Sequence, residues 1–258
     1  MNPAIGYRFL RLVDRIRRGS ELPLGPDQLA LPPPAFMELV CGRVDNLVEQ
    51  FKWAGAVVAR MLDDEAMMMQ DSAFLDVGCG CGRVARYLLQ KPIASYTGFD
   101  RHPGMIRWCR DNISRHARNF EFQYHSVKSA YRALDGHDGA QAAGEFIFPY
   151  RDESFDAVLL ASIFTHMPLE ECAHYLKELY RVLRFGGKVL LSVFLTDGEA
   201  HSNGVDFHYN ASAFLKNTAE TGFDFKFREE LKGHHWYILF KPGRKQEGDA
   251  RIPGRSDL

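Results

Sequence analysis

The sequence predicts an α/β fold in which a largely parallel sheet carries helices on both faces. Short apolar runs of strand type alternate along the chain with segments whose apolar residues recur at helical spacing. Residues 157–160 are continuously apolar, which is typical of a strand buried on both faces of a parallel sheet. Near the end of the chain, two strand-like segments are joined by a short turn, which predicts an antiparallel hairpin in the sheet.

The bulk properties fit one such domain with an appendage. The chain has 258 residues, of which 46% are hydrophobic and 25% are charged, which is enough for one good core. Its net charge of -1 gives no overall attraction to nucleic acid or to an anionic membrane. No apolar run of about 18 residues predicts a membrane span, and no basic and apolar leader opens the chain. We therefore expect a cytoplasmic protein that does not span a membrane.

The five cysteines also favour the cytoplasm. Their number is odd and their spacing is not that of a disulfide framework. Cys79 and Cys81 are separated by one residue within a glycine-rich turn, and no second pair of Cys or His residues accompanies them. We therefore expect no metal site there.

Residues 1–70 predict a helical extension ahead of the sheet. In the first part, arginines alternate with apolar residues at helical spacing, namely Ile5, Phe9, Leu12, Val13 and Ile16. Such a basic amphipathic helix can lie on an anionic surface, but a solvated charged face on a helix packed against the main domain is the more frequent arrangement. After the prolines at 32–34, residues 39–62 show a longer helical pattern.

Residues 74–88 predict a strand, a tight turn and a helix, and they are the main candidate for a ligand site. Gly78, Gly80 and Gly82 permit positive φ and lack the Cβ atoms that keep a ligand away from the backbone. The free N–H groups of the following helix start favour a phosphate. Asp76 instead favours a positively charged group on the ligand, because a carboxylate repels a pyrophosphate and attracts an ammonium. The expected ligand is therefore positive or zwitterionic.

Residues 76–82, Asp-Val-Gly-Cys-Gly-Cys-Gly, resemble the first motif of the class I S-adenosylmethionine-dependent methyltransferases, of the small-molecule kind (types 11 and 25). The resemblance implies a Rossmann-like, seven-stranded mixed sheet and S-adenosyl-L-methionine as cofactor, with Asp76 and the glycine loop at its amino acid end. It also implies that the N-terminal helices cap the cofactor cleft. Residues 80–85 fit the G-x-G-x-x-A dinucleotide fingerprint as well, which leaves a nicotinamide-dependent oxidoreductase open.

The next predicted strand, 95–100, ends in a second carboxylate that is a candidate for ligand binding. Asp100 lies 24 residues after Asp76. A carboxylate in this place accepts hydrogen bonds from two vicinal ribose hydroxyls, in dinucleotide and adenosylmethionine sites alike. Asp100 therefore predicts an adenosine-containing ligand without choosing between the two. Arg101, which follows it, is assigned to the same cofactor site.

A third strand is predicted at 120–124, and a polar loop follows at 128–145. The resemblance aligns Ser126 with an acidic residue that accepts from the adenine amino group in the family, and the backbone of Val127 is the alternative partner. Loops at the carboxyl end of an open α/β sheet face the cleft, so Tyr131 is a candidate substrate contact, although a solvated loop is the more frequent outcome.

Residues 148–156 resemble the family's Pro-Phe-x-Asp-x-Ser-Phe-Asp entry into the fourth strand. The methyl acceptor must come to the carboxyl end of that strand. We assign Ser162 there to the cofactor and Phe164 to the substrate. His166 has two interpretations. It is either a general base, for which its ordinary pKa of about 6.5 is suited, or a group that lines the pocket or bonds to the backbone.

Residues 181–187, Arg-Val-Leu-Arg-Phe-Gly-Gly, resemble the family's Arg-Val-Leu-Lys-Pro-Gly-Gly signature, whose glycines turn the chain out of a helix. A fifth strand is predicted at 188–194. The final hairpin joins strands at 223–227 and 236–240 through a turn at 232–235. The methyltransferase topology has such a hairpin and the standard dinucleotide fold lacks it, so the hairpin favours a methyltransferase.

We therefore expect an adenosylmethionine-binding methyltransferase domain at 71–241 and a disordered, charged tail at 242–258. The predicted activity is methyl transfer (EC 2.1.1.-) to the hydroxyl of a small molecule. The fourth strand ends in Leu-Ala-Ser-Ile instead of Asn-Pro-Pro-Tyr, which disfavours nucleobase amino groups as acceptors. The alternatives are the oxidoreductase and a catalytically silent module that binds the cofactor without an acceptor pocket. The sequence leaves the oligomeric state open.

Overall fold

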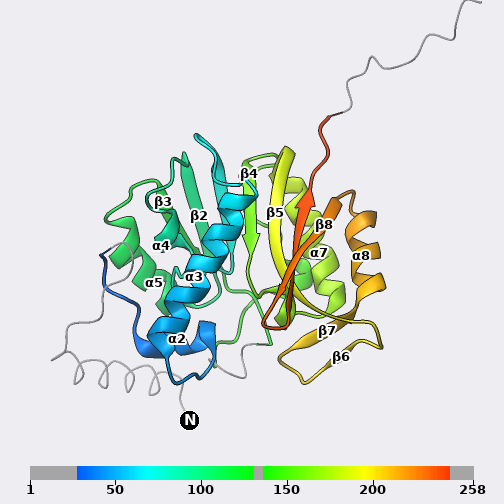
Figure 1. The fold of residues 1–258 in the computed structure, drawn as a ribbon, viewed down its shortest axis with the longest axis horizontal. Helices are drawn as coiled ribbons and strands as arrows, with labels where there is room; N and C mark the ends of the chain where they lie inside the picture. Colours follow the sequence, from blue (N-terminus) through cyan, green and yellow to red (C-terminus); the bar gives the residue numbers. More distant parts are fainter. Residues whose placement is uncertain (1–27, 131–135, 245–258) are drawn as a thin grey trace, which may run out of the picture.

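The computed structural model describes residues 28–130 and 136–244. Within them, a nine-stranded sheet lies between two layers of helices (Figure 1). The basic helix expected before residue 28, Tyr131 and the tail from residue 245 lie outside the described residues. None of the helices in the described ranges is long and apolar enough to cross a membrane.

The sheet is parallel through its first five strands and ends in an antiparallel hairpin. Its spatial order is β3-β2-β1-β4-β5-β9-β8, and a small β6–β7 hairpin pairs with the last residues of β5. The strands are β1 (Ala73–Val77), β2 (Ser95–Asp100), β3 (Phe120–Tyr124), β4 (Phe155–Leu160), β5 (Leu183–Thr196), β6 (His201–Ser202), β7 (Phe207–Asn210), β8 (Asp224–Leu231) and β9 (His234–Phe240). The predicted mixed sheet with a C-terminal hairpin is confirmed.

Each face of the sheet buries its own core, because alternate residues of a strand point to opposite faces. In β1, Phe74 packs with α3 (Leu47–Asp64), α4 (Ala85–Leu88) and α5 (Pro103–Cys109). Leu75 packs on the other face, which α7 (Leu169–Val182) and α8 (Ala211–Glu220) cover (Figure 1). The fully buried strands explain the continuous apolar runs in the sequence.

The carboxyl ends of the parallel strands lie at the lower edge of Figure 1, together with α2 (Pro34–Cys41) and the β6–β7 hairpin. A small third core joins α2 and α3 to the glycine turn through Met37, Phe51 and Cys81. A π-helical turn (Arg110–Ser114) extends α5, and short 3-10 turns occur at Ala143–Glu145 and at Phe164–His166 (η3). The extension before the sheet is therefore held against the glycine turn.

The glycines at the end of the signature 181–187 do not turn the chain out of a helix as predicted. Helix α7 already ends at Val182, and Leu183 is extended, so Gly186 and Gly187 lie within β5. The Lys241 ammonium takes over the capping role, since Nζ donates to the carbonyls of Tyr180 (2.8 Å) and Leu183 (2.7 Å). A partner 58 residues away cannot be read from the local pattern.

Candidate functional site

A cleft opens at the carboxyl ends of β1, β2, β3 and β4, and α2 closes one side of it. Eight of the residues predicted for the site line this cleft: Asp76, Gly78, Gly80, Asp100, Arg101, Val127, Ser162 and His166. Leu39 and Val40 of α2, Arg83 and Met105 line it as well. The sequence motifs, which are up to 90 residues apart, thus meet in one place.

Backbone hydrogen bonds and close packing fix the conformation of the glycine turn. The N–H groups of Gly78 and Cys79 both donate to the Phe99 carbonyl, at 2.8 and 3.0 Å, which joins the turn to the end of β2. Gly78 has a φ of +73°, and a Cβ on it would lie 2.0 Å from Cδ1 of Ile163. Gly82 instead faces Ile113 and is not among the residues that line the cleft. Its role is to let the turn pack closely.

Asp76 lies at the floor of the cleft and is only 3% exposed. It accepts a hydrogen bond of 2.6 Å from the hydroxyl of Tyr96, which is itself fully buried in β2. Burial raises the pKa of Asp76 from 3.8 to about 7, although the Tyr96 hydrogen bond acts in the opposite direction. Ionised Asp76 is thus a costly buried charge, which an ammonium group in the cleft would stabilise. Sequence reasoning missed Tyr96, which is an ordinary strand residue in the pattern.

Asp100 has both carboxylate oxygens anchored to backbone. Oδ2 accepts from the N–H of Gly80 at 2.9 Å, and Oδ1 accepts from the N–H of His102 at 2.7 Å. These bonds fix its orientation between the glycine turn and the start of α5. Each oxygen has a second lone pair, so the carboxylate can still accept from a ligand.

The loop after β3 is tied to β2. Arg101 Nε donates to the Val127 carbonyl at 3.2 Å, and its guanidinium also contacts the His137 carbonyl. Ser126 Oγ accepts from the N–H of Ala140 at 3.0 Å, so it orders the inserted loop and does not line the cleft. Lys128 and Ser129, which sequence reasoning missed, line the cleft beside Val127.

The chain leaves β4 through a left-handed residue. Ser162 has a φ of +59°, and its N–H donates to Oγ of the fully buried Ser192 at 2.8 Å. A non-glycine residue in this conformation is strained and is held only by its surroundings. The turn directs the Ile163 side chain against Gly78, so the strand end and the glycine turn fit each other.

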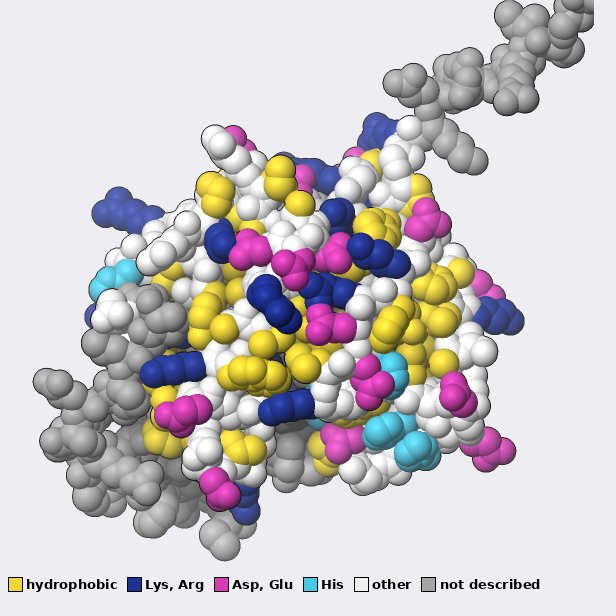
Figure 2. Space-filling model, in the orientation of Figure 1, with side chains coloured by type: hydrophobic (Ala, Val, Ile, Leu, Met, Phe, Trp, Pro, Cys, Tyr) yellow, Lys and Arg dark blue, Asp and Glu magenta, His cyan; other side chains and the backbone are white. Residues whose placement is uncertain are grey.

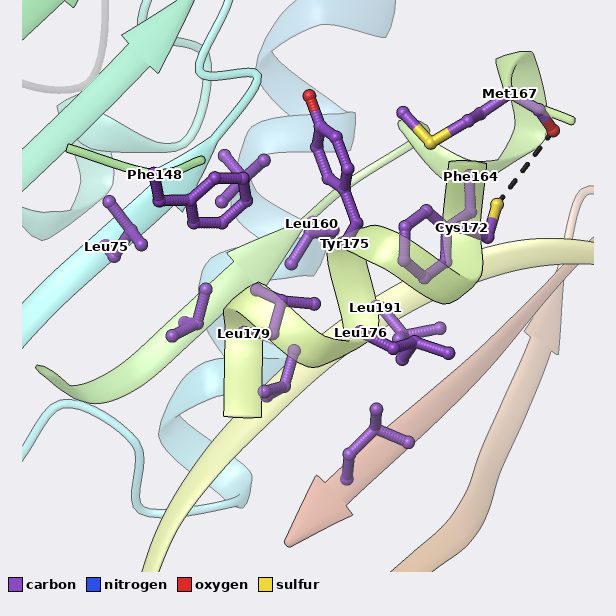
Figure 3. Close-up of a cluster of buried hydrophobic side chains, with 14 of the residues drawn as sticks. Leu75, Phe148, Leu160, Phe164, Met167, Cys172, Tyr175, Leu176, Leu179 and Leu191 are labelled. Atoms are coloured by element: carbon purple, nitrogen blue, oxygen red, sulfur yellow. Dashed lines mark hydrogen bonds between the residues drawn. The ribbon is translucent and has the colours of Figure 1, made fainter. Parts of the chain in front are cut away.

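The structure separates Phe164 from His166, which the sequence had placed together at the cleft. Phe164 is fully buried among core side chains such as Tyr175 (Figure 3), and its ring also packs against Phe214. Because η3 is a 3-10 turn, residues three apart share one side, and Ile163 and His166 both line the cleft. Ile163, Met167 and Tyr175 therefore take the place expected for Phe164.

His166 lines the cleft beyond the carboxyl end of β4, and its side chain is 13% exposed. Its Nδ1 is 3.0 Å from the Val205 carbonyl and 3.2 Å from Oδ1 of Asp206. A carbonyl only accepts, so this contact requires the proton on Nδ1. Burial lowers the pKa of His166 below 6.5, against the opposing effects of Val205 and Asp206. Burial therefore favours the neutral form of the ring.

The sequence was compared with known proteins. Residues 75–191 match the sequence profile of the family described as "Methyltransferase domain". The methyltransferase GfsG of Streptomyces halstedii is 25% identical over 155 residues, 60% of this chain and 48% of its own. Tocopherol O-methyltransferase of Arabidopsis thaliana is 26% identical over 149 residues, 58% of this chain and 36% of its own. The chain thus spans about half or less of the length of these relatives.

Solved structures show the same fold. The [4+2]-cyclase SpnF aligns with a TM-score of 0.57 at 16% identity, over 87% of this chain and 99% of its own. An adenosylmethionine-dependent methyltransferase of Methanosarcina mazei aligns with a TM-score of 0.52 at 19% identity, over 70% of this chain and 97% of its own. Fold, sequence motifs and family profile together support a class I S-adenosylmethionine-dependent methyltransferase, and hence S-adenosyl-L-methionine as the cofactor.

Proposed function

We propose that this chain is a methyltransferase that transfers a methyl group from S-adenosylmethionine to the hydroxyl of a small molecule. The observation that carries the proposal is the meeting of two anchored carboxylates, a glycine turn and a histidine in one cleft. Asp76 and Asp100 would bind the two ends of the cofactor, and His166 would face the acceptor. Arg101, Val127 and Ser162 would complete the cofactor side.

The residues present fit the cofactor. S-adenosylmethionine has an ammonium group, for which the buried carboxyl of Asp76 is suited, and vicinal ribose hydroxyls, which Asp100 is oriented to accept from. The Gly78 side of the turn has no room even for a Cβ, so the backbone itself forms that wall of the cleft. The bound cofactor supplies a methyl group that is already activated on a sulfonium.

The protein's own task is then to align the acceptor and to receive its proton. Alignment of two reactants supplies about 7–11 kcal/mol in well-oriented cases. The apolar side chains of Leu39, Val40, Ile163 and Met167 would hold the body of the acceptor out of water. With the proton on Nδ1, His166 has Nε2 as the nitrogen that would take the hydroxyl proton.

The names of the relatives differ in the acceptor atom. One is named for O-methylation of tocopherol, and another, sterol 24-C-methyltransferase of Debaryomyces hansenii, for C-methylation. The latter is 23% identical over 200 residues, 71% of this chain and 48% of its own. A buried histidine, whose neutral form is favoured, supports a hydroxyl acceptor, because removal of the hydroxyl proton is the step that a base would assist.

Two experiments test the proposal in order. Calorimetric titration should show binding of S-adenosylhomocysteine and none of NAD, and the reverse result would establish the oxidoreductase alternative. Formation of S-adenosylhomocysteine is then measured with S-adenosylmethionine and a panel of phenols and aliphatic alcohols. The second step is necessary because the likeness to a [4+2]-cyclase shows the fold alone. Cofactor binding without transfer to any hydroxyl, thiol, amine or carbon acceptor would indicate a silent module.

A further inference from the structure

The β6–β7 hairpin, which the sequence did not predict, contacts the candidate base directly. It lies between β5 and α8 in the chain and pairs with the last residues of β5, at the carboxyl edge of the sheet (Figure 1). Its connecting loop supplies both partners of His166 Nδ1, the Val205 carbonyl and the Asp206 carboxylate. Histidine side chains also gather on the surface over this part of the molecule (Figure 2).

Hydrogen bonds within the loop between β6 and β7 fix the position of Asp206. Asn203 Oδ1 accepts from the N–H groups of Val205 (2.9 Å) and Asp206 (2.7 Å), which closes the turn with Gly204 at a φ of +89°. Asn203 Nδ2 donates to Oδ2 of Asp206 at 3.1 Å. One carboxylate oxygen is therefore held by Asn203 while the other faces His166.

A second contact fixes η3 to the same hairpin. The hydroxyl of Tyr209, a residue of β7 that is 2% exposed, contacts the carbonyls of Phe164 and Met167 and lies 3.2 Å from the Cys172 thiol. The carbonyls flank His166 in sequence. The β6–β7 hairpin thus contacts both the ring nitrogen of His166 and the backbone on either side of this residue.

We propose that Asp206 is a positioning residue that holds the Nδ1–H edge of His166, so that Nε2 faces the acceptor. This inference rests on the proposed function of His166. In the transfer step, the acceptor O–H bond would break and its proton would go to Nε2, while the oxygen would form the new bond to the methyl carbon. The bond from that carbon to the sulfonium sulfur would break at the same time, and its electron pair would stay on the sulfur of the departing S-adenosylhomocysteine. The proton on Nδ1 stays, and the Asp206 carboxylate offsets the positive charge that develops on the ring.

Other titratable groups near the ring do not replace Asp206. Burial lowers the pKa of His234, in β9, to about 4, with a smaller contribution from His166 in the same direction, so His234 is neutral at pH 7. Arg83, beside the glycine turn, acts on His234 and is attached to the Val40 carbonyl at 2.7 Å. Asp206 raises the pKa of His166, which is the direction that a group stabilising the imidazolium must have.

The test needs no knowledge of the acceptor. Long-range ¹H–¹⁵N NMR of the full chain, with histidine-labelled protein, reports the tautomer and titration of each ring, and His166→Gln assigns the His166 signals. We expect the Nδ1–H tautomer in the wild type. In Asp206→Asn, the amide oxygen can still accept, so the tautomer is kept while the pKa of His166 falls by about one unit, because an opposite charge at hydrogen-bonding distance is lost.

Asp197→Asn is the matched control, since it removes the same charge from an exposed position before the hairpin. It should leave the titration of His166 unchanged. An Asp206→Asn curve equal to that of the wild type, or a wild-type ring with the proton on Nε2, would overturn the inference. Asp206→Ala should keep the Nδ1–H tautomer, because the Val205 carbonyl still accepts from it, but should lower the pKa of His166 as Asp206→Asn does. An unchanged pKa in that variant would also contradict the role.

Failure of this inference can be distinguished from failure of the proposed function. Asp206 does not line the cleft, so S-adenosylhomocysteine should bind Asp206→Asn as tightly as it binds the wild type. If the wild type does not bind this ligand, the methyltransferase proposal fails while the NMR result still decides on Asp206. With an acceptor from the panel, the acid limb of the kcat profile should move to lower pH in Asp206→Asn, with KM for S-adenosylmethionine unchanged.

Discussion

The two ends of the cleft are built in different ways. At the cofactor end, Asp76, the glycine turn and Asp100 come from adjacent strands and are fixed by backbone hydrogen bonds within a short stretch of chain. At the proposed acceptor end, His166 contacts a backbone carbonyl and a carboxylate of a hairpin about 40 residues further along. The proposed cofactor end is thus defined by local motifs, and the proposed acceptor end by an element that is distant in the chain.

This difference predicts that changes at the acceptor end stop transfer without affecting cofactor affinity. His166→Gln should lower kcat by about 100 to 10,000-fold when a hydroxyl acceptor is used, because a general base contributes that range. S-adenosylhomocysteine should still bind with the wild-type affinity in calorimetry. His208→Gln, which changes a histidine of the hairpin outside the cleft, is the control and should keep full activity. A drop of less than about fivefold in His166→Gln would reduce the histidine to a pocket-lining role.

The reverse pattern is expected for Asp100→Asn at the cofactor end. The N–H groups of Gly80 and His102 donate to the carboxylate of Asp100. The oxygen of an asparagine at this position can accept from only one of them, and its NH₂ group would face the other donor. Loss of a hydrogen bond to a charged group costs about 1.5–3 kcal/mol, which corresponds to a decrease of about 10 to 150-fold in affinity for S-adenosylhomocysteine. The exposed Asp111→Asn serves as the comparison. Equal titration curves for the two variants would remove Asp100 from the site.

The pH dependence of binding distinguishes the two ends further. Burial raises the pKa of Asp76 to about 7, so the carboxyl is protonated below that pH and cannot attract the ligand's ammonium. Affinity for S-adenosylhomocysteine should therefore fall about tenfold for each pH unit below 7 and level off above it. Tyr96→Phe removes the hydrogen bond that lowers this pKa, so the midpoint should move to higher pH. A midpoint that does not respond to Tyr96→Phe would assign the pH effect to another group.

The same shift affects stability with the opposite sign. In the folded, ligand-free chain Asp76 keeps its proton up to about pH 7, whereas the unfolded chain releases it near 3.8. The folded state therefore binds more protons between these values, and this group makes the free energy of unfolding fall as the pH rises from about 4 to 7. Urea unfolding of the wild type and of Asp76→Asn at pH 4.5 and 7.5 measures this, because the asparagine variant lacks the titration.

The sequence predicts the cofactor end of the cleft to a larger extent than the acceptor end. Asp76, Gly78 and Asp100 lie in patterns whose spacing is dictated by a strand, a turn and a ligand, so local reasoning placed them on the cleft. Ser126 failed to line it because a loop residue's direction depends on its partner, here the N–H of Ala140. Phe164 was misplaced because the 3-10 spacing of η3, three residues per turn, could not be recognised before the fold was known.

The hairpin at the acceptor end was missed for a different reason. Strand β6 has two residues and β7 has four, which is too short for any periodic pattern, and both depend on pairing with β5. His234 was likewise assigned to a turn, but the turn consists of Lys232 and Gly233, at φ of 51° and 77°, and His234 begins β9. Such elements are decided by tertiary contacts, which a window of sequence does not contain.

The smallest predicted effect concerns the attachment of the hairpin to η3. Tyr209→Phe keeps the ring packed on Phe214 but removes the hydroxyl that contacts the two carbonyls flanking His166. The loss of such a hydrogen bond should lower the free energy of unfolding by about 1 kcal/mol, measured by urea denaturation, against no change in the exposed Tyr124→Phe. Because η3 would lose a contact with the hairpin, kcat should fall while affinity for S-adenosylhomocysteine stays constant. An equal loss of affinity for S-adenosylhomocysteine would mean that the two ends of the cleft do not respond independently, contrary to the difference described above.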